Sequence, residues 1–271
     1  MIAWYTNHFI SQKIMRSVAI GFKCIAKDTS LFKEGIKKGM FKDEAILYGI
    51  LRGCSDVIHH NFKNGLDYLH LDLGYIKRSL HNKGQFDGYY RISLNDTQAH
   101  YKDINLPEDR LKKLDIVCKD WQNNKNGYFL ICPPTDAICI FYGIDVKKWI
   151  DTTIHKLGDR HYKIREKNDV SMSVSLKDDL AGAKAVITFN SNVALDATLE
   201  GIPAIVTSQH SVIKNWNNLT MSNLDNCIEI SQNLDRDKLL RFISYHQFTL
   251  KEIESGLAFA IIKKIREQGV Y

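Results

Sequence analysis

The chain has 271 residues, of which 44% are hydrophobic and 25% charged, and its formal net charge is +6. This composition excludes an intrinsically disordered chain, because the apolar content is sufficient for a buried core. The sequence has no run of about 18 apolar residues, so we expect no membrane-spanning helix. The mildly basic charge suits a phosphate-bearing partner, and it suits plain solubility equally well.

The N-terminal residues and the cysteines indicate the cellular compartment in which we expect the protein. Residues 1–13 lack the basic-then-apolar order of a secretory signal. None of the six cysteines belongs to a Cys-x-x-Cys pair, which argues against a zinc ribbon and a thioredoxin motif. We therefore expect reduced thiols, no metal site and a cytoplasmic location, while the oligomeric state stays open.

The first half of the chain carries strand and helix signals at uneven spacing. Ile2–Tyr5 predicts an edge strand, and an amphipathic helix is expected within His8–Cys24. Further elements follow from apolar runs and alternation: strands at 45–51, 66–71 and 88–94, and a short helix at 106–114.

The second half alternates regularly between strands and helices. Strands are expected at 127–132, 161–165, 185–189 and 203–206, with helices at 146–157, 175–183 and 191–201 between them. Such alternation predicts βαβ units and a parallel sheet, whose ligands collect at the carboxyl ends of the strands. Thr249 and Glu252 form a capping box that predicts a terminal helix to about Glu267.

We predict an α/β fold with two Rossmann-like halves and an interdomain cleft. The polar, turn-rich segment 121–126 is the expected boundary. Residues 1–122 would form an acceptor-side domain and residues 123–248 a nucleotide-sugar-binding domain. Residues 249–271 would form a terminal helix that packs back across both domains.

The segment 185–206 (AVITFNSNVALDATLEGIPAIV) is the most informative in the sequence. A strand leads to Asn190 and Ser191, where a helix begins. The unpaired backbone amides of a helix start, together with the helix dipole, suit a diphosphate. Asp196 and Glu200 on that helix are placed to meet sugar or ribose hydroxyls. The alternative is a plain βαβ unit with a capping serine.

This segment resembles the donor-site element of glycosyltransferases with the GT-B fold. The shared pattern is a strand, Ser191, an acidic residue before alanine at 196–197, then Gly201-x-Pro203 and another strand. The chain departs from it in having Asp196 where glutamate is usual and no Gly-Gly before Ser191. The element is similar, too, to capsular polysaccharide synthesis proteins and to sugar-nucleotide epimerases of the same fold.

Further segments resemble phage-encoded, glycosyltransferase-like proteins of the DNA-modification type. They are YGILRG (48–53), YLHLDLGY (68–75), GYYRISLN (88–95), ICPP (131–134) and QFTLKEIESG (247–256). The resemblance implies a transferase in the host cytoplasm that moves a sugar onto a hydroxymethylated pyrimidine in phage DNA. The alternatives are a surface or capsular polysaccharide transferase, a non-catalytic nucleotide- or nucleic-acid-binding module, and an epimerase.

Asp72 is the candidate general base, because a carboxylate within reach of an acceptor hydroxyl speeds transfer by about 10²–10⁴. It follows an apolar strand, where a turn-forming aspartate is the alternative. His59 and His60 are rival bases, although paired histidines more often belong to an ordinary helix.

Basic residues at strand ends are the candidate phosphate ligands, since an arginine fork binds phosphate oxygens bidentately. Arg165 and Lys167 would hold the donor diphosphate. The donor itself would be held by Asn190, Ser191, Asn192 and Asp196. Other phosphate or acceptor candidates are Arg52, Arg91 and Tyr90.

Several signatures are missing from the sequence, among them a Walker loop, GxGxxG, HExxH and GxSxG. The only Asp-x-Asp, at 235–237, precedes an amphipathic helix. We therefore expect no tightly bound cofactor and no metal. The expected substrate is a nucleotide-diphosphate sugar, with UDP-sugar first, and double-stranded DNA with modified bases is the candidate partner.

Overall fold

The computed structural model describes residues 1–37, 42–79, 81, 84–167 and 175–269. The chain divides into two compact units, each discontinuous in sequence. Unit 1 comprises Met1–Ala99, Ile104–Leu114 and Leu240–Tyr271, and unit 2 comprises His100–Asp103 and Asp115–Leu239. The divisions fall at Leu114/Asp115 and Leu239/Leu240, whereas the expected ranges divide the chain at 122/123 and 248/249.

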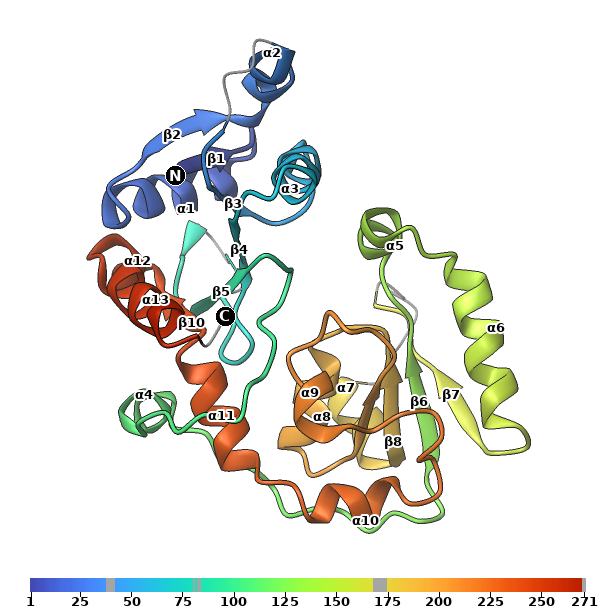
Figure 1. Ribbon diagram of the computed structural model, residues 1–271. Helices are drawn as coiled ribbons and strands as arrows, with labels where there is room; N and C mark the ends of the chain where they lie inside the picture. The colour runs from blue at the N-terminus through green and yellow to red at the C-terminus, as the bar shows by residue number, and fades with distance from the viewer. Residues whose placement is uncertain (38–41, 80, 82–83, 168–174, 270–271) are drawn as a thin grey trace. The chain divides into compact units, whose positions relative to one another are not determined.

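Unit 1 contains a six-stranded sheet in the order β10-β5-β4-β3-β1-β2 (Figure 1). Strands β1 to β4 are parallel, and β5 and β10 add antiparallel. The strands are β1 (Ile2–Tyr5), β2 (Ile25–Asp28), β3 (Ala45–Tyr48), β4 (Tyr68–Leu73), β5 (Tyr89–Leu94) and β10 (Gln247–Thr249). The helices are α1 (Phe9–Gly21), η1 (Thr29–Leu31), α2 (Phe32–Lys37), α3 (Cys54–Lys63), α4 (Asp109–Leu114), α11 (Arg236–Ser244, most of it in unit 1), α12 (Leu250–Glu254) and α13 (Leu257–Glu267).

Unit 2 contains a four-stranded, all-parallel sheet in the order β7-β6-β8-β9. Its strands are β6 (Tyr128–Cys132), β7 (Tyr162–Ile164), β8 (Ala183–Thr188) and β9 (Ala204–Val206). Its helices are α5 (Asp136–Tyr142), α6 (Val146–Leu157), α7 (Leu176–Ala181), α8 (Val193–Leu199), α9 (Lys214–Asn217) and α10 (Cys227–Gln232). The regular alternation in the sequence thus forms a parallel sheet, as the pattern predicts.

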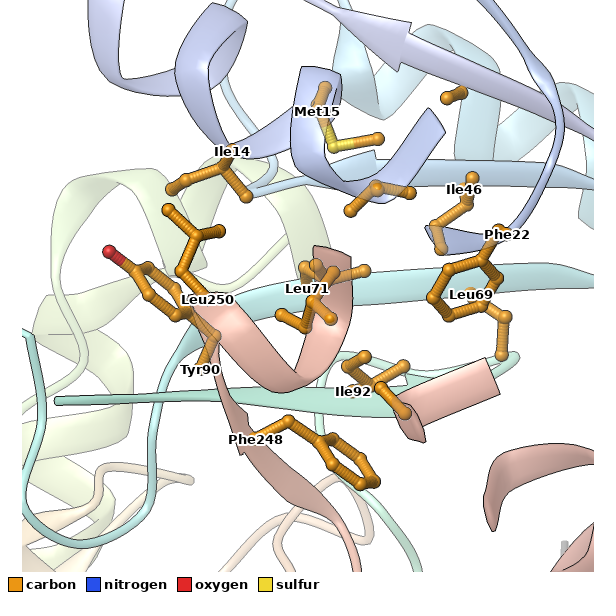
Figure 2. Close-up of a cluster of buried hydrophobic side chains, with 14 of the residues drawn as sticks. Ile14, Met15, Phe22, Ile46, Leu69, Leu71, Tyr90, Ile92, Phe248 and Leu250 are labelled. Carbon is orange, nitrogen blue, oxygen red and sulfur yellow. The ribbon is translucent and has the colours of Figure 1, made fainter. Parts of the chain in front are cut away.

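The core of unit 1 lies between its sheet and helices α1, α12 and α13 (Figure 2). Strand alternation explains its composition, since Leu69 and Leu71 of β4 point to one face with Tyr90 and Ile92 of β5. Helix α1 approaches α12 so closely that a Cβ on Gly21 would lie 1.8 Å from the Ile253 carbonyl oxygen. The three helices therefore pack as one layer on this face of the sheet.

The terminal helix differs from the single helix that the capping box predicts. The box itself is present, because Thr249 and Glu252 exchange side-chain and backbone hydrogen bonds at the start of α12. The helix stops at Glu254, and a second one begins after Gly256, whose φ is +83°. A left-handed glycine ends an α-helix, so α12 and α13 are separate elements. Both belong to unit 1.

Arg110 of α4 joins the C-terminal segment to the rest of unit 1. Its guanidinium donates to the carbonyl oxygens of Ser244 and Gln247 at 2.7 and 2.9 Å and to the Glu252 carboxylate at 3.0 Å. It also lies 4.7 Å from the centre of the Phe248 ring. One buried cation thereby satisfies a helix end, an edge strand and a capping residue together.

Two histidines in unit 1 are buried without charge. Burial lowers the pKa of His70 on β4 and of His246 after α11 to about 4 each. The nearby carboxylates of Asp72 and Asp96 act in the opposite direction on His70 but do not outweigh burial. Both side chains are therefore neutral imidazoles in the folded protein near neutral pH.

We expect stability to fall on acidification. Unfolded histidine takes up its proton near pH 6.5 and the folded histidines only near pH 4, so stability present above pH 6.5 is lost between those values. The loss should be about 2 kcal/mol per histidine between about pH 7.5 and pH 5. Urea unfolding at both pH values measures it. His246→Asn should remove about half of the histidine-dependent slope, and an unchanged slope would contradict this assignment.

Candidate functional site

The carboxyl ends of the unit 2 strands are the first candidate site. In a parallel sheet these ends lie along one edge, where α/β proteins bind their ligands. Thr188 at the end of β8 donates a hydrogen bond of 2.7 Å to the Cys132 carbonyl at the end of β6, and Thr207 after β9 donates one of 3.0 Å to Thr188. The edge therefore carries the segments 133–135, 165–167, 189–192 and 207–210, in four adjacent turns.

The turn after β8 differs in one respect from the expected helix start. Asn190 is buried, and Ser191 and Asn192 are half-buried. The backbone amides of residues 193 to 196 are already paired: with the Ser191 hydroxyl, the Ser191 carbonyl and, twice, the Asn192 carbonyl. The predicted open amide donors are thus absent at these four positions, because Ser191 and Asn192 close the first turn themselves. What the turn offers to a ligand is side-chain hydroxyl and amide groups.

Asp196 and Glu200, both candidates for hydroxyl recognition, lie in different surroundings. Asp196 lines an open hollow of about 300 Å³ between α7 and α8, with Leu176, Lys177, Leu180, Leu199 and Glu200. The Glu200 carboxylate pairs with Lys119, and its carbonyl accepts from the Gln122 side chain at 2.9 Å. Glu200 therefore holds the segment before β6 against the end of α8.

The Gly201-Ile202-Pro203 motif has a packing role in this chain. Gly201 has a φ of +78°, and a Cβ there would lie 2.0 Å from the Asp120 carbonyl oxygen. Its own carbonyl accepts from the Gln122 amide at 2.7 Å, and the Lys119 amide donates to Leu199 at 2.9 Å. These bonds fasten residues 119–122 to unit 2, which is why the polar segment 121–126 does not mark the unit boundary.

The basic segment after β7 lies beside a buried carboxylate. The Arg165 backbone amide donates to Ile131 at 2.9 Å, which places Arg165 next to the carboxyl end of β6. Its guanidinium, like the Lys163 ammonium, is bonded to the carboxylate of Asp179 in α7. Lys167, two residues beyond Arg165, is exposed. Arg165 and Lys167 thus stand at the edge as expected, and Asp179 is a partner that sequence reasoning missed.

An aromatic cluster at the same edge is also absent from the sequence-based site. Tyr142, at the end of α5, stacks on His210 with ring centres 4.5 Å apart and contacts Phe189 at 5.7 Å. The positions of Phe189 and His210 after two strands are readable from the sequence. Tyr142 belongs to a helix, and only the fold brings its ring to the turns after β8 and β9.

The second candidate site lies in unit 1 around Asp72. This residue is within β4 rather than beyond it, and its register partner on β5 is Arg91. Arg91 donates to one carboxylate oxygen at 2.7 Å, and the Leu73 amide donates to the other at 2.8 Å. Arg91 also donates to the Thr97 carbonyl at 3.2 Å. The structure therefore brings two predicted site residues together as an ion pair, with Arg91 buried.

A buried polar face surrounds this pair. His70, Asp72, Arg91 and Ser93 share the face of β4 and β5 opposite the apolar core, as strand alternation requires. Among the residues that the structure describes, neither ring nitrogen of His70 has a hydrogen-bond partner, although the side chain is 1% exposed. A histidine inside a hydrophobic strand usually indicates packing, so the sequence gives little warning of this polar layer.

The remaining candidates in unit 1 belong to other elements than Asp72 or point away from it. Tyr90 is fully buried in the apolar core (Figure 2), and its hydroxyl donates to Ser79 at 3.0 Å. Its position on β5 turns it to the opposite face from Arg91, so it is a core residue rather than a phosphate or acceptor ligand. Arg52 is exposed before α3, with a φ of +54°. His59 and His60 lie within α3.

The described ranges show neither a metal-binding cluster nor a membrane-spanning helix. Those residues contain no group of three or more His, Cys, Asp or Glu side chains placed to hold a metal ion. In the same part of the chain, no helix combines the length and apolar character needed to cross a bilayer.

We expect Gly201→Ala to destabilise unit 2 through packing. Alanine at a positive φ costs roughly 1–2 kcal/mol, and displacing the Asp120 carbonyl adds about 1–3 kcal/mol. Gly143→Ala is the matched control, because Gly143 has a φ of +65° with no atom within 4 Å of the added Cβ. Chemical unfolding of both variants compares them. Equal losses would show that the approach to Asp120 carries no cost.

Comparison with known proteins supports the fold. No family model matches the sequence, and no curated protein matches it. One solved structure, Thermosulfurimonas dismutans KpsC, β-Kdo 2,7 transferase, is 14% identical with a TM-score of 0.49, over 95% of this chain and 99% of that chain. Another, the β-Kdo 2,4 transferase of KpsC from the same organism, is 10% identical with a TM-score of 0.51, over 92% and 91%. The second likeness and the two sheets confirm the predicted fold class of two Rossmann-like α/β halves.

Proposed function

We propose that the protein is a glycosyltransferase that moves a sugar from a nucleotide-sugar donor to a hydroxyl acceptor. The proposal is supported by the fold, which resembles that of a chain described as a Kdo transferase along 92% of this sequence. It is supported as well by the residues at the carboxyl edge of unit 2. Unit 2 would bind the donor, and unit 1 would supply the group that accepts a proton.

The observation that carries the proposal is the order of strands at that edge. Arg165 follows β7 and Ser191 follows β8, with only β6 between them. Neighbouring strands are about 4.8 Å apart, so the two positions are separated by about 10 Å. An extended nucleoside diphosphate can meet both. Arg165 and Lys167 would hold the phosphates, and Asn190, Ser191, Asn192 and Asp196 would contact the nucleoside and sugar.

Asp72 would act as the general base. Its carboxylate is 36% exposed, so an acceptor hydroxyl can reach it. Arg91 donates to one oxygen of this carboxylate and the Leu73 amide donates to the other. These two bonds would fix the orientation of the group toward the acceptor hydroxyl. Arg91 would then orient Asp72 rather than bind phosphate.

Two acceptors fit the proposal. The fold likeness to a chain described as a β-Kdo 2,4 transferase favours a saccharide hydroxyl. The resemblance of short segments to phage proteins, with the net charge of +6, favours a hydroxymethylated pyrimidine in DNA. Transfer to a saccharide acceptor at a rate that added duplex DNA does not change supports the saccharide hydroxyl. Binding to modified duplex that weakens steeply with salt supports the second.

We expect Asp72→Asn to lower the turnover number by about 10²–10⁴, with the dissociation constant of the donor changed less than about twofold. The amide keeps the shape of the side chain but cannot accept the proton. Asp225→Asn is the control, because Asp225 also pairs with an arginine, Arg160, at 2.8 Å on an exposed surface. Steady-state transfer assays and donor titrations measure both effects. Normal turnover in the Asp72 variant would remove this residue from the mechanism.

A thermal-shift screen against nucleoside mono- and diphosphates and their sugars tests the donor site. A ligand present at about 100 times its dissociation constant stabilises the folded state by about 2.7 kcal/mol, and we expect uridine nucleotides to give the largest shift. Stabilisation without hydrolysis or transfer would indicate a binding module instead of an enzyme. Conversion of the donor without an acceptor would indicate an epimerase.

A further inference from the structure

Asp179 is a buried carboxylate that the proposed reaction does not yet use. It lies in the first turn of α7 and is 1% exposed. Its two oxygens accept hydrogen bonds from Lys163 and Arg165, one from each side chain. The bond to Asp179 is the main cause of a raised pKa of the Lys163 ammonium. The three side chains form a triad with a net charge of +1.

This arrangement differs from that of an ordinary surface ion pair. Burying a carboxylate is costly unless cations and hydrogen bonds compensate, and buried ion pairs add little net stability. Their better-attested role is to fix one arrangement of side chains. The neighbouring Asp178 shows the contrast, since it is exposed and bonds to Ser175 in the capping box of α7.

Arg165 and Lys163 are both partly exposed. Its side chain is 20% exposed and that of Lys163 is 35% exposed, although both are bonded to Asp179. Burial raises the pKa of the Cys132 thiol to about 12, and the charges of Arg165 and Asp179 act on the same thiol. The ion pair therefore lies beside the end of β6, next to the turn that carries Asn190 and Ser191.

We propose that Asp179 is a positioning residue that holds the Arg165 guanidinium, together with Lys163, in the orientation that binds the phosphates of the nucleotide-sugar donor. This inference rests on the proposed function, because it assigns the donor phosphates to Arg165. The bond to the buried carboxylate fixes the plane of the guanidinium, and the exposed fifth of the Arg165 side chain is the part that would meet the phosphates. An unfixed arginine would lose side-chain entropy on binding, which the triad avoids.

The direction in which nucleotide affinity changes when Asp179 is replaced distinguishes a positioning role from a purely electrostatic one. Asp179 is negative, so its removal would strengthen the binding of an anion if only Coulomb attraction mattered. If Asp179 orients Arg165, its removal weakens binding despite the gain in positive charge. The two ideas thus predict opposite changes from one substitution.

The test is isothermal titration of the full-length chain with UDP, ADP, GDP and CDP. Asp179→Asn should weaken the tightest of these by about 10- to 100-fold, the range of a lost hydrogen bond to a charged group. Asp178→Asn is the matched control and should stay within about twofold. In an Arg165→Met background, Asp179→Asn should have no further effect, since residues that act through one contact are not additive.

A charge-balanced variant provides a second test if Asp179→Asn alone fails to fold. Asp179→Asn combined with Lys163→Met keeps the net charge of the triad at +1 and leaves no unpaired lysine. We expect the same weakening in this variant. Unchanged or tighter binding in either variant would overturn the positioning role while leaving the donor site in place. A wild-type chain that binds none of the four nucleotides would overturn both this inference and the proposed donor site.

Discussion

The structure of unit 1 depends on the contacts of one buried cation, Arg110. The chain leaves unit 1 after α4 and returns to it at Leu240, so the unit must be closed by two segments that are distant in sequence. Arg110 binds the end of α11, strand β10 and the capping residue of α12 at once, and it lies against the Phe248 ring. Through these contacts β10 forms the sheet edge beside β5, and α12 and α13 cover the core together with α1.

The two units treat buried polar groups differently, and each arrangement bears on function. Unit 1 keeps a polar layer on one face of β4 and β5, where Asp72 is fixed by Arg91 and lies near a neutral histidine. Unit 2 keeps its polar groups at the end of the sheet, where Asp179 bonds to Lys163 and Arg165, and where Ser191 and Asn192 pair with the amides of residues 193 to 196. In both, a carboxylate and an arginine are paired before any ligand is present. Paired charges of this kind lose less orientation freedom when a substrate binds, which is the physical basis of preorganisation.

Some of the proposed site residues could be identified from the sequence, and others could not be told apart from core residues. Residues directly after strands, such as Arg165 and Ser191, were identifiable because a parallel sheet places all such residues at one edge. Tyr90 and Arg91 are neighbours with the same sequence signal, yet one lies in the core and the other pairs with Asp72. Glu200 is a candidate for hydroxyl recognition by its sequence position, and the structure pairs its carboxylate with Lys119. These distinctions depend on which face of a strand or end of a helix is covered, and the covering segments are far away in the chain.

The sequence by itself determined the α/β class, the parallel order of strands and helices in the second half, the helix start at Ser175, the capping box at Thr249 and the helix end at Gly201. All of these follow from periodicity, caps and backbone conformation, which act within about ten residues. Only the tertiary structure decided the unit boundaries and the division of the terminal helix into α12 and α13. It also decided the partners of Arg110, Asp72 and Asp179. The physical reason is that a buried charge pairs with whichever groups the fold brings near it. For Arg110 and Glu252, those partners are more than a hundred residues apart in the sequence.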